Sequence, residues 1–206
     1  MKKFFTNIPL QVRGQLVRYQ YQAVGNDRLR WDKATSFPIL CAVNGYVKPG
    51  EDFRLIAVVS NTDDGRRNLA ALESEVQELC AENGIRCPMG VETVPAPDNE
   101  RVSSHMDTFQ KLIDYTDDGD ELFSCVTFGT KPMSMAILMA IRYAYRLKKN
   151  TSVSCVVYGQ VDRSGSEPRP FVYDETALVQ MDEILRLLAE RGVDDPRRVL
   201  DSILSL

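Results

Sequence analysis

The 206-residue chain has few of the residues that build metal or redox centres: one histidine and five scattered cysteines. No two cysteines have Cys-x-x-Cys spacing, so the sequence predicts neither a zinc site nor a redox dithiol, and we expect no metal and no cofactor. Because most of the cysteines lie among apolar residues, we expect buried, reduced thiols. They are Cys41, Cys80, Cys87, Cys125 and Cys155.

Positive charge is also in short supply, since 25 lysines and arginines stand against 29 acidic residues and the net charge is −4. Without a broad basic surface, we expect no binding to duplex nucleic acid or to an acidic membrane. No apolar run approaches the roughly 20 residues that span a bilayer. Residues 1–9 lack the apolar segment of a signal peptide. We therefore expect a cytoplasmic protein, and any nucleic-acid ligand should be small and bound locally.

Strand and helix patterns alternate along the chain, which predicts an α/β, Rossmann-like domain with a mainly parallel sheet and helices on both faces. The predicted strands are residues 3–6, 53–60, 85–94, 122–127 and 152–160. The predicted helices between them are residues 39–43, 61–83, 106–115 and 133–147.

An inserted β-hairpin is predicted near the N-terminus. Residues 16–21 and 29–31 contain strand-forming residues and flank the turn signal Gly25-Asn26-Asp27. Such a turn between two short strand patterns is typical of a hairpin, which we place at the edge of the sheet.

The end of the chain departs from the alternating pattern. Residues 163–173 contain proline and glycine and are predicted to be a linker. Two helical patterns follow and predict a C-terminal helical pair. We therefore divide the chain into a Rossmann-like domain at 1–162, this linker, and helices at 174–206 that pack on the domain or on a partner.

Ligands of open α/β sheets bind beyond the carboxyl ends of the strands. Small hydroxyl or amide residues follow three of the predicted strands and suit hydrogen bonding to a sugar, a base edge or a phosphate. The candidate ligand-binding residues are Thr6, Asn7, Ser60, Asn61, Thr62, Thr127, Gly129, Thr130, Lys131, Met133 and Ser134.

The most informative of these segments is residues 127–132. Gly129 would let a ligand approach the backbone closely, and Pro132 fits the first helical position. The free amides of the next two residues and the helix dipole favour an anion, to which Lys131 adds a positive charge. The segment is not a Walker A loop, because the upstream glycine and the Lys-Ser/Thr order are absent. It predicts a phosphate cradle, with an ordinary strand-to-helix turn as the alternative.

Three further titratable residues have simpler interpretations. His105 is the single histidine and lies near the start of a predicted helix, where a surface or capping role is more typical than proton transfer. Asp63 and Asp64 are typical residues for a helix start and are not predicted to be ligands.

The turn at 127–132 also resembles part of a known family. The strand end VTFGTKPM, leading into AILMAIRYAYRLKKN, is similar to the second signature region of CARF proteins, the CRISPR-associated Rossmann-fold sensors. Tyr19, Tyr21 and the stretch TSFPIL resemble the front of the same domain. The likeness covers residues 1–162, and its specific part is Thr-x-Gly-Thr-Lys-Pro. The first strand departs from the family's glycine- or serine-rich turn, since Thr6-Asn7-Ile8-Pro9 stands there.

The resemblance implies a homodimer that binds one cyclic oligoadenylate in type III CRISPR antiviral signalling, with cyclic tetra-adenylate (cA4) ahead of the six-membered ring. No effector module is recognised after the sensor, which favours a ring nuclease, a metal-independent phosphodiesterase. The ligand's own 2′-hydroxyl would attack the adjacent phosphate and give a 2′,3′-cyclic phosphate. Lys131 and the Met133 amide would stabilise the developing charge and Thr130 would orient the phosphate, so Lys131 and Thr130 are the catalytic candidates.

The helix predicted at 133–147 agrees with a dimer. It is apolar nearly all round, with Arg142 and Arg146 as a narrow polar strip. A helix on one sheet face shows a single apolar stripe, so we expect this helix to be covered on two sides. The second cover is either another copy of the chain, which would bring two copies of Lys131 together, or the C-terminal helices.

Two other functions stay open. One is a non-catalytic sensor that passes ring binding to a separate effector protein through its final helices, where an amphipathic stripe lies. That stripe consists of Leu178, Met181, Leu185 and Leu188. The other is an unrelated nucleotide-binding protein of Rossmann-like architecture.

Overall fold

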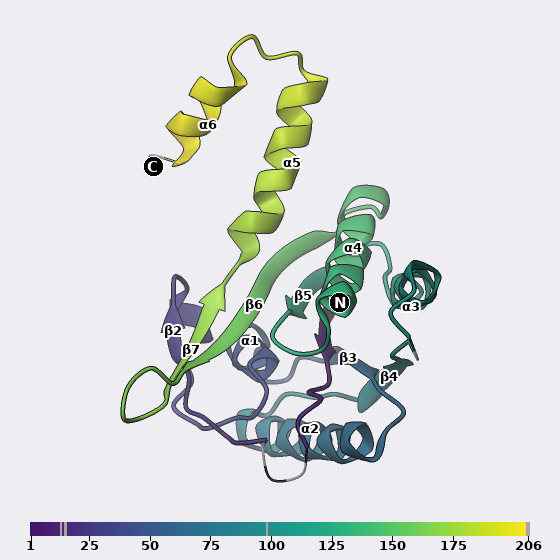
Figure 1. The fold of residues 1–206 in the computed structure, drawn as a ribbon, viewed down its shortest axis with the longest axis vertical. Coiled ribbons are helices and arrows are strands. Elements are labelled where there is room, and N and C mark those ends of the chain that lie inside the picture. Colours follow the sequence, from purple (N-terminus) through teal and green to yellow (C-terminus); the bar gives the residue numbers. More distant parts are fainter. Residues whose placement is uncertain (13, 15, 98, 205–206) are drawn as a thin grey trace. The chain divides into compact units, whose positions relative to one another are not determined.

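A seven-stranded sheet forms the centre of the first of two units, Met1–Asp174 and Glu175–Leu206 (Figure 1). The computed structural model describes residues 1–12, 14, 16–97 and 99–204. The strand order is β2-β7-β6-β5-β1-β3-β4. The strands are β1 (Lys2–Asn7), β2 (Gln22–Val24), β3 (Phe53–Val59), β4 (Val91–Pro95), β5 (Glu121–Cys125), β6 (Ser152–Asp162) and β7 (Arg169–Asp174).

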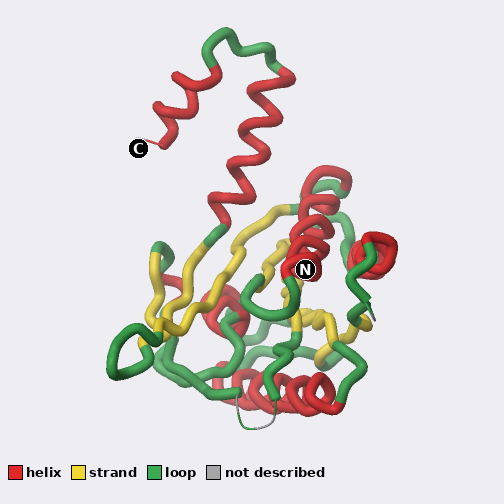
Figure 2. Tube along the Cα trace, viewed as in Figure 1, coloured by secondary structure: helices red, strands yellow, loops and turns green. Residues whose placement is uncertain are grey.

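Five of these strands, β4, β3, β1, β5 and β6, run parallel to one another, whereas β7 is antiparallel to β6. Helices connect the parallel strands and lie on both sides of the sheet (Figure 2). α1 and α2 pack on one face, and α3 and α4 pack together on the other. Their bounds are α1 (Ile39–Tyr46), α2 (Asp63–Asn83), α3 (Val102–Ile113) and α4 (Lys131–Leu147). The predicted α/β class with a largely parallel, Rossmann-like sheet is confirmed.

The strand β1, the middle one of the five parallel strands, is buried on both faces, and all of its residues except Lys2 are buried. Phe4 and Phe5 are both fully buried and point to opposite faces. The Phe4 ring stacks on Phe123 of β5 at 4.3 Å between centroids and meets Phe53 of β3 edge-on at 5.7 Å. These rings hold together the three strands whose carboxyl ends carry most of the candidate ligand residues.

A buried lysine lies at the opposite end of β1. The Lys3 side chain is 2% exposed, and its Nζ lies 2.6 Å from Asp120, which is 3% exposed, and 2.7 Å from Asp117. Nζ also donates to the Tyr115 carbonyl at 2.8 Å. A buried ammonium requires such a set of partners, because each unpaired buried charge is costly. This ion cluster fixes β1 against the loop that precedes β5.

The predicted hairpin is wrong. The Asn26 side chain accepts a hydrogen bond from the Arg28 amide at 3.0 Å and so caps a short 3-10 helix, Asp27–Leu29, in place of a second strand. Residues 22–24 instead form β2, which pairs in parallel with β7. Of the expected antiparallel pairing, one isolated bridge between Tyr19 and Thr35 is present.

Two further boundaries need correction. The linker predicted at 163–173 contains most of β7. The sequence did not predict this strand because it contains Pro170, and proline is unusual inside strands. This residue pairs with Val161 of β6, but β2 pairs only with 171–173, so the missing amide hydrogen of Pro170 interrupts no ladder with β2. The strand predicted at 85–94 begins only at Val91, because the chain turns at residues 87–90.

The second unit contains two helices, α5 (Thr176–Glu190) and α6 (Pro196–Leu204). The predicted C-terminal helical pair is confirmed, and Pro196 stands at the first position of α6, where its missing amide hydrogen is harmless. None of the helices in the described ranges has the length and apolar content that crossing a membrane requires.

Candidate functional site

The chain leaves β1 and β5, which lie side by side, in opposite directions. The connection after β1 leads to α1 on one face, whereas the turn after β5 leads directly into α4 on the other face (Figure 1). Such a switch point opens a crevice at the carboxyl ends of the two strands and is the usual ligand site of open α/β sheets. The structure therefore brings Asn7, at the end of β1, together with the turn at residues 126–130.

Asn7 fixes this turn. Its side chain is completely buried, and Nδ2 donates to the Phe128 carbonyl at 3.0 Å and lies 3.4 Å from Ser134 Oγ. Ser134 Oγ lies at the same distance from the Phe128 carbonyl. Asn7 thus ties β1 to the turn and to the first helical turn of α4, and the Ser134 hydroxyl is engaged within the protein.

Gly129 has a different role from the predicted one. Its φ is +82°, and a Cβ atom built on it would lie 2.9 Å from Asn7 Cγ. Both the left-handed backbone and the close approach of Asn7 therefore require glycine. The group that approaches the Gly129 backbone is Asn7, whereas the sequence analysis expected a ligand there.

The hydroxyls of Thr6 and Thr127 are also engaged within the protein. Thr127 Oγ1 accepts a hydrogen bond from the Gly159 amide of β6 at 2.7 Å and lies 3.1 Å from Cys125 Sγ. Thr6 Oγ1 donates to the Asn7 carbonyl at 3.3 Å. Burial raises the pKa of the Cys125 thiol above its ordinary value. These groups hold the strand ends in place and do not point to a ligand.

The N-terminus of α4 is where unused hydrogen-bonding groups remain. Thr130 is the N-cap residue but makes no side-chain cap, and its Oγ1 is buried with no hydrogen-bond partner in the described part of the chain. Pro132 has no amide hydrogen, and within the same ranges the amides of Lys131 and Met133 have no acceptor. Asn7 Oδ1 is likewise buried without a partner. The Lys131 side chain is exposed beside these groups.

This arrangement favours an anion. Two free amides, one hydroxyl and one ammonium are donors, and the helix dipole adds partial positive charge at the same point. The side chain of Met133 is buried in the core, so only its backbone amide can serve as a donor. Of the residues predicted after β5, the structure therefore leaves Thr130, Lys131 and the Met133 amide available to a ligand.

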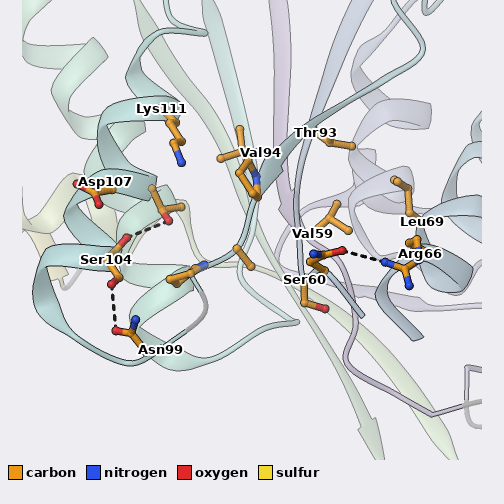
Figure 3. A pocket seen from close by; sticks show the side chains of 15 residues that line it. Val59, Ser60, Arg66, Leu69, Thr93, Val94, Asn99, Ser104, Asp107 and Lys111 are labelled. Atoms are coloured by element: carbon orange, nitrogen blue, oxygen red, sulfur yellow. Dashed lines mark hydrogen bonds between the residues drawn. The ribbon is translucent and has the colours of Figure 1, made fainter. Parts of the chain in front are cut away.

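The N-terminus of α2, which follows β3, does not form a second anion site. The Thr62 hydroxyl caps α2 by accepting from the Gly65 amide at 3.0 Å and lies 3.1 Å from Ser60 Oγ. Asp63 and Asp64 occupy the first turn of α2, as the sequence predicted, and their charge opposes an anion there. Ser60 and Asn61 instead line a cavity at the ends of β3 and β4 (Figure 3).

His105 lies in the first half of α3, with its Nε2 3.1 Å from the Glu100 carboxylate. In the residues that the structure describes, no three His, Cys, Asp or Glu side chains gather as a metal site. The five cysteines, all within the described ranges, form no disulfide. Three are buried as predicted, whereas Cys80 and Cys87 are partly exposed.

The sequence analysis missed Phe128 and Gly159, which place the turn through their backbones. Gly159 could have been identified from the sequence, because a glycine within a predicted strand often marks a place where another group approaches the backbone closely. A Cβ atom there would lie 2.2 Å from Pro38 Cγ and 3.3 Å from Thr127 Oγ1. Phe128 acts through its carbonyl, for which side-chain identity gives no signal.

No family model matches the chain, and no curated protein is significantly similar to it.

Proposed function

We propose that the chain is a CARF-type protein that binds cyclic oligoadenylate, foremost cyclic tetra-adenylate, across two copies of the β1–β5 switch point. The observation that carries the proposal is the uncapped N-terminus of α4 beside Lys131, with the buried oxygens of Asn7 and Thr130 still unpartnered. A phosphate of the ring would accept hydrogen bonds from the free amides and from Lys131. A ribose hydroxyl or an adenine amino group would donate to Asn7 Oδ1.

The exposed face of α4 supports a twofold dimer. Met135 and Met139 lie four residues apart on the same face as Lys131 and are 60% and 43% exposed. Within the first unit, α4 is therefore uncovered along this stripe, where the sequence analysis expected a second cover. Methionine is well suited to an adaptable apolar contact. A second copy packed on the stripe would bury these side chains and bring two copies of Lys131 to one ring.

Cleavage of the bound ring follows from positioning and charge. The ribose 2′-oxygen attacks the adjacent phosphorus as the 2′-hydroxyl loses its proton. The bond from phosphorus to the 5′-oxygen breaks, and that oxygen gains a proton. The products carry a 2′,3′-cyclic phosphate and a 5′-hydroxyl. Lys131 and the Met133 amide stabilise charge on the phosphate oxygens, and Thr130 orients the phosphate through its hydroxyl.

The test is incubation of the pure protein with radiolabelled cyclic tetra- and hexa-adenylate in EDTA, followed by chromatography of the products. Linear products with a 2′,3′-cyclic phosphate support the ring nuclease. Ring that stays bound but intact supports a non-catalytic sensor, and absence of binding contradicts the whole proposal.

A matched pair of variants locates the site. Lys131→Ala removes the ammonium at the start of α4, whereas Lys149→Ala removes one just beyond its other end. We expect the first variant to lose at least about tenfold in ring affinity or turnover, since charge-assisted hydrogen bonds contribute about 1.5–3 kcal/mol. The second variant should behave as the unmodified protein.

A further inference from the structure

A second candidate site lies in the cavity at the carboxyl ends of β3 and β4, between α2 and α3 (Figure 3). Its volume is about 570 Å³, within the range of small-molecule sites. None of the switch-point residues Asn7, Thr130 and Lys131 lines it. The cavity is therefore separate from the site at the start of α4.

The wall of this cavity is apolar between two cations. Val59 of β3 and the residues Pro95, Ala96 and Pro97 supply apolar lining at the strand ends, with Lys111 of α3 on one side and Arg66 of α2 on the other (Figure 3). Such an arrangement provides a surface for the body of a ligand and charged groups at its ends.

The two cations differ in availability. Arg66 donates to the Asn61 side-chain oxygen at 2.9 Å and to the Asp63 carboxylate at 2.5 Å. Lys111 is exposed, points into the space in front of β4, and has no ion-pair partner in the described ranges. Asp107 is the one carboxylate in the lining, and no ion pair joins it to Lys111. Lys111 is thus the cation that an anionic ligand can engage without breaking an existing pair.

The amide side chains of the lining add donors. The Asn61 oxygen is occupied by Arg66, and the Asn99 oxygen accepts from the Arg101 amide and from Ser104 Oγ, both at 3.0 Å. Their NH₂ groups are then left to donate to a ligand. A cavity that offers an ammonium and two amide NH₂ groups against one carboxylate favours a ligand rich in acceptors and negatively charged.

We propose that this cavity binds a phosphate monoester with a flat apolar body, of about the size of a nucleoside monophosphate. The phosphate lies at Lys111, and the body lies on the apolar lining at Val59, Pro95 and Ala96. The proposal is independent of ring binding at the switch point, because different side chains carry it.

The test is calorimetric titration with adenosine 5′-monophosphate, inorganic phosphate and adenosine as probes. We expect the monophosphate to bind, and both adenosine and inorganic phosphate to bind at least about tenfold more weakly, because each lacks one of the two contacts. Absence of monophosphate binding to the unmodified protein would overturn the proposal, as would equal affinity for all three probes.

Variants separate the two sites. Lys111→Met should weaken monophosphate binding about tenfold, whereas Lys149→Met and Lys131→Ala should leave it unchanged. Lys111 is exposed, so its replacement should not affect folding, which circular dichroism checks. Unchanged affinity in Lys111→Met, or lost affinity in Lys131→Ala, would refute the cavity assignment. Neither result would depend on whether cyclic oligoadenylate binds.

Discussion

Replacement of Gly129 by alanine should destabilise the protein through its contact with Asn7. The added Cβ would lie 2.9 Å from Asn7 Cγ and 3.0 Å from its Cβ, at a φ of +82°. The left-handed backbone costs a residue with a side chain about 1–2 kcal/mol, and overpacking at a buried contact costs about 1–3 kcal/mol. We therefore expect the free energy of unfolding to fall by roughly 2–5 kcal/mol.

A double-mutant cycle isolates the contact. In an Asn7→Ala background Asn7 Cγ is gone, whereas its Cβ at 3.0 Å and the left-handed backbone remain, so Gly129→Ala should cost less there than in the unmodified protein but still more than about 1 kcal/mol. Urea unfolding followed by circular dichroism gives the four free energies. A cost for Gly129→Ala below about 0.5 kcal/mol, or additive effects of the two changes, would refute the view that Asn7 and Gly129 form one packed unit.

Three other predictions concern buried charge and thiols. Lys3→Met should lower the free energy of unfolding by up to about 3–5 kcal/mol, because it removes the nearest cation of the buried Asp120 carboxylate, which then keeps only the N-terminal ammonium at 3.4 Å as an ion-pair partner. Urea unfolding measures this, and a change below about 1 kcal/mol would contradict it. The Lys3 ammonium lowers the pKa of Asp117. The stabilisation from this ion pair is therefore present above about pH 4 and is lost as the pH falls through the lowered pKa. Acid unfolding should show this loss of stability, and the loss should be smaller in Lys3→Met. Burial raises the pKa of Cys87 to about 12. Iodoacetamide at pH 8 should therefore label this thiol about a thousandfold more slowly than free cysteine, as followed by mass spectrometry. Labelling at the rate of free cysteine would contradict the raised pKa.

The elements with the strongest local signals were predictable from the sequence. The apolar run at 53–59 gave β3, and α2 ends at Asn83 because Gly84 takes up a left-handed φ of +63°. The turn into α4 was also located correctly, since Pro132 suits the first turn of a helix. In each case the residues that determine the structure lie within a few positions of one another.

Features that depend on distant partners were not predictable. The sequence placed Lys3 in a strand but gave no sign that its ammonium is buried, because its acidic partners lie more than a hundred residues away. The same holds for Asn7, because nothing in the sequence indicates that its Nδ2 donates to the Phe128 carbonyl and so fixes the turn. Local pattern therefore located the candidate site, whereas the division between positioning groups and available groups required the three-dimensional structure.

The stoichiometry of ring binding is the most direct measure of the central claim, that the N-termini of two α4 helices, one from each chain, bind one ring. Calorimetric titration of cyclic tetra-adenylate into the protein should give one ring for every two chains, and the affinity should fall at least about tenfold when Lys131 is replaced by alanine. Saturation at one ring per chain, or the same binding curve with and without the Lys131 ammonium, would contradict it.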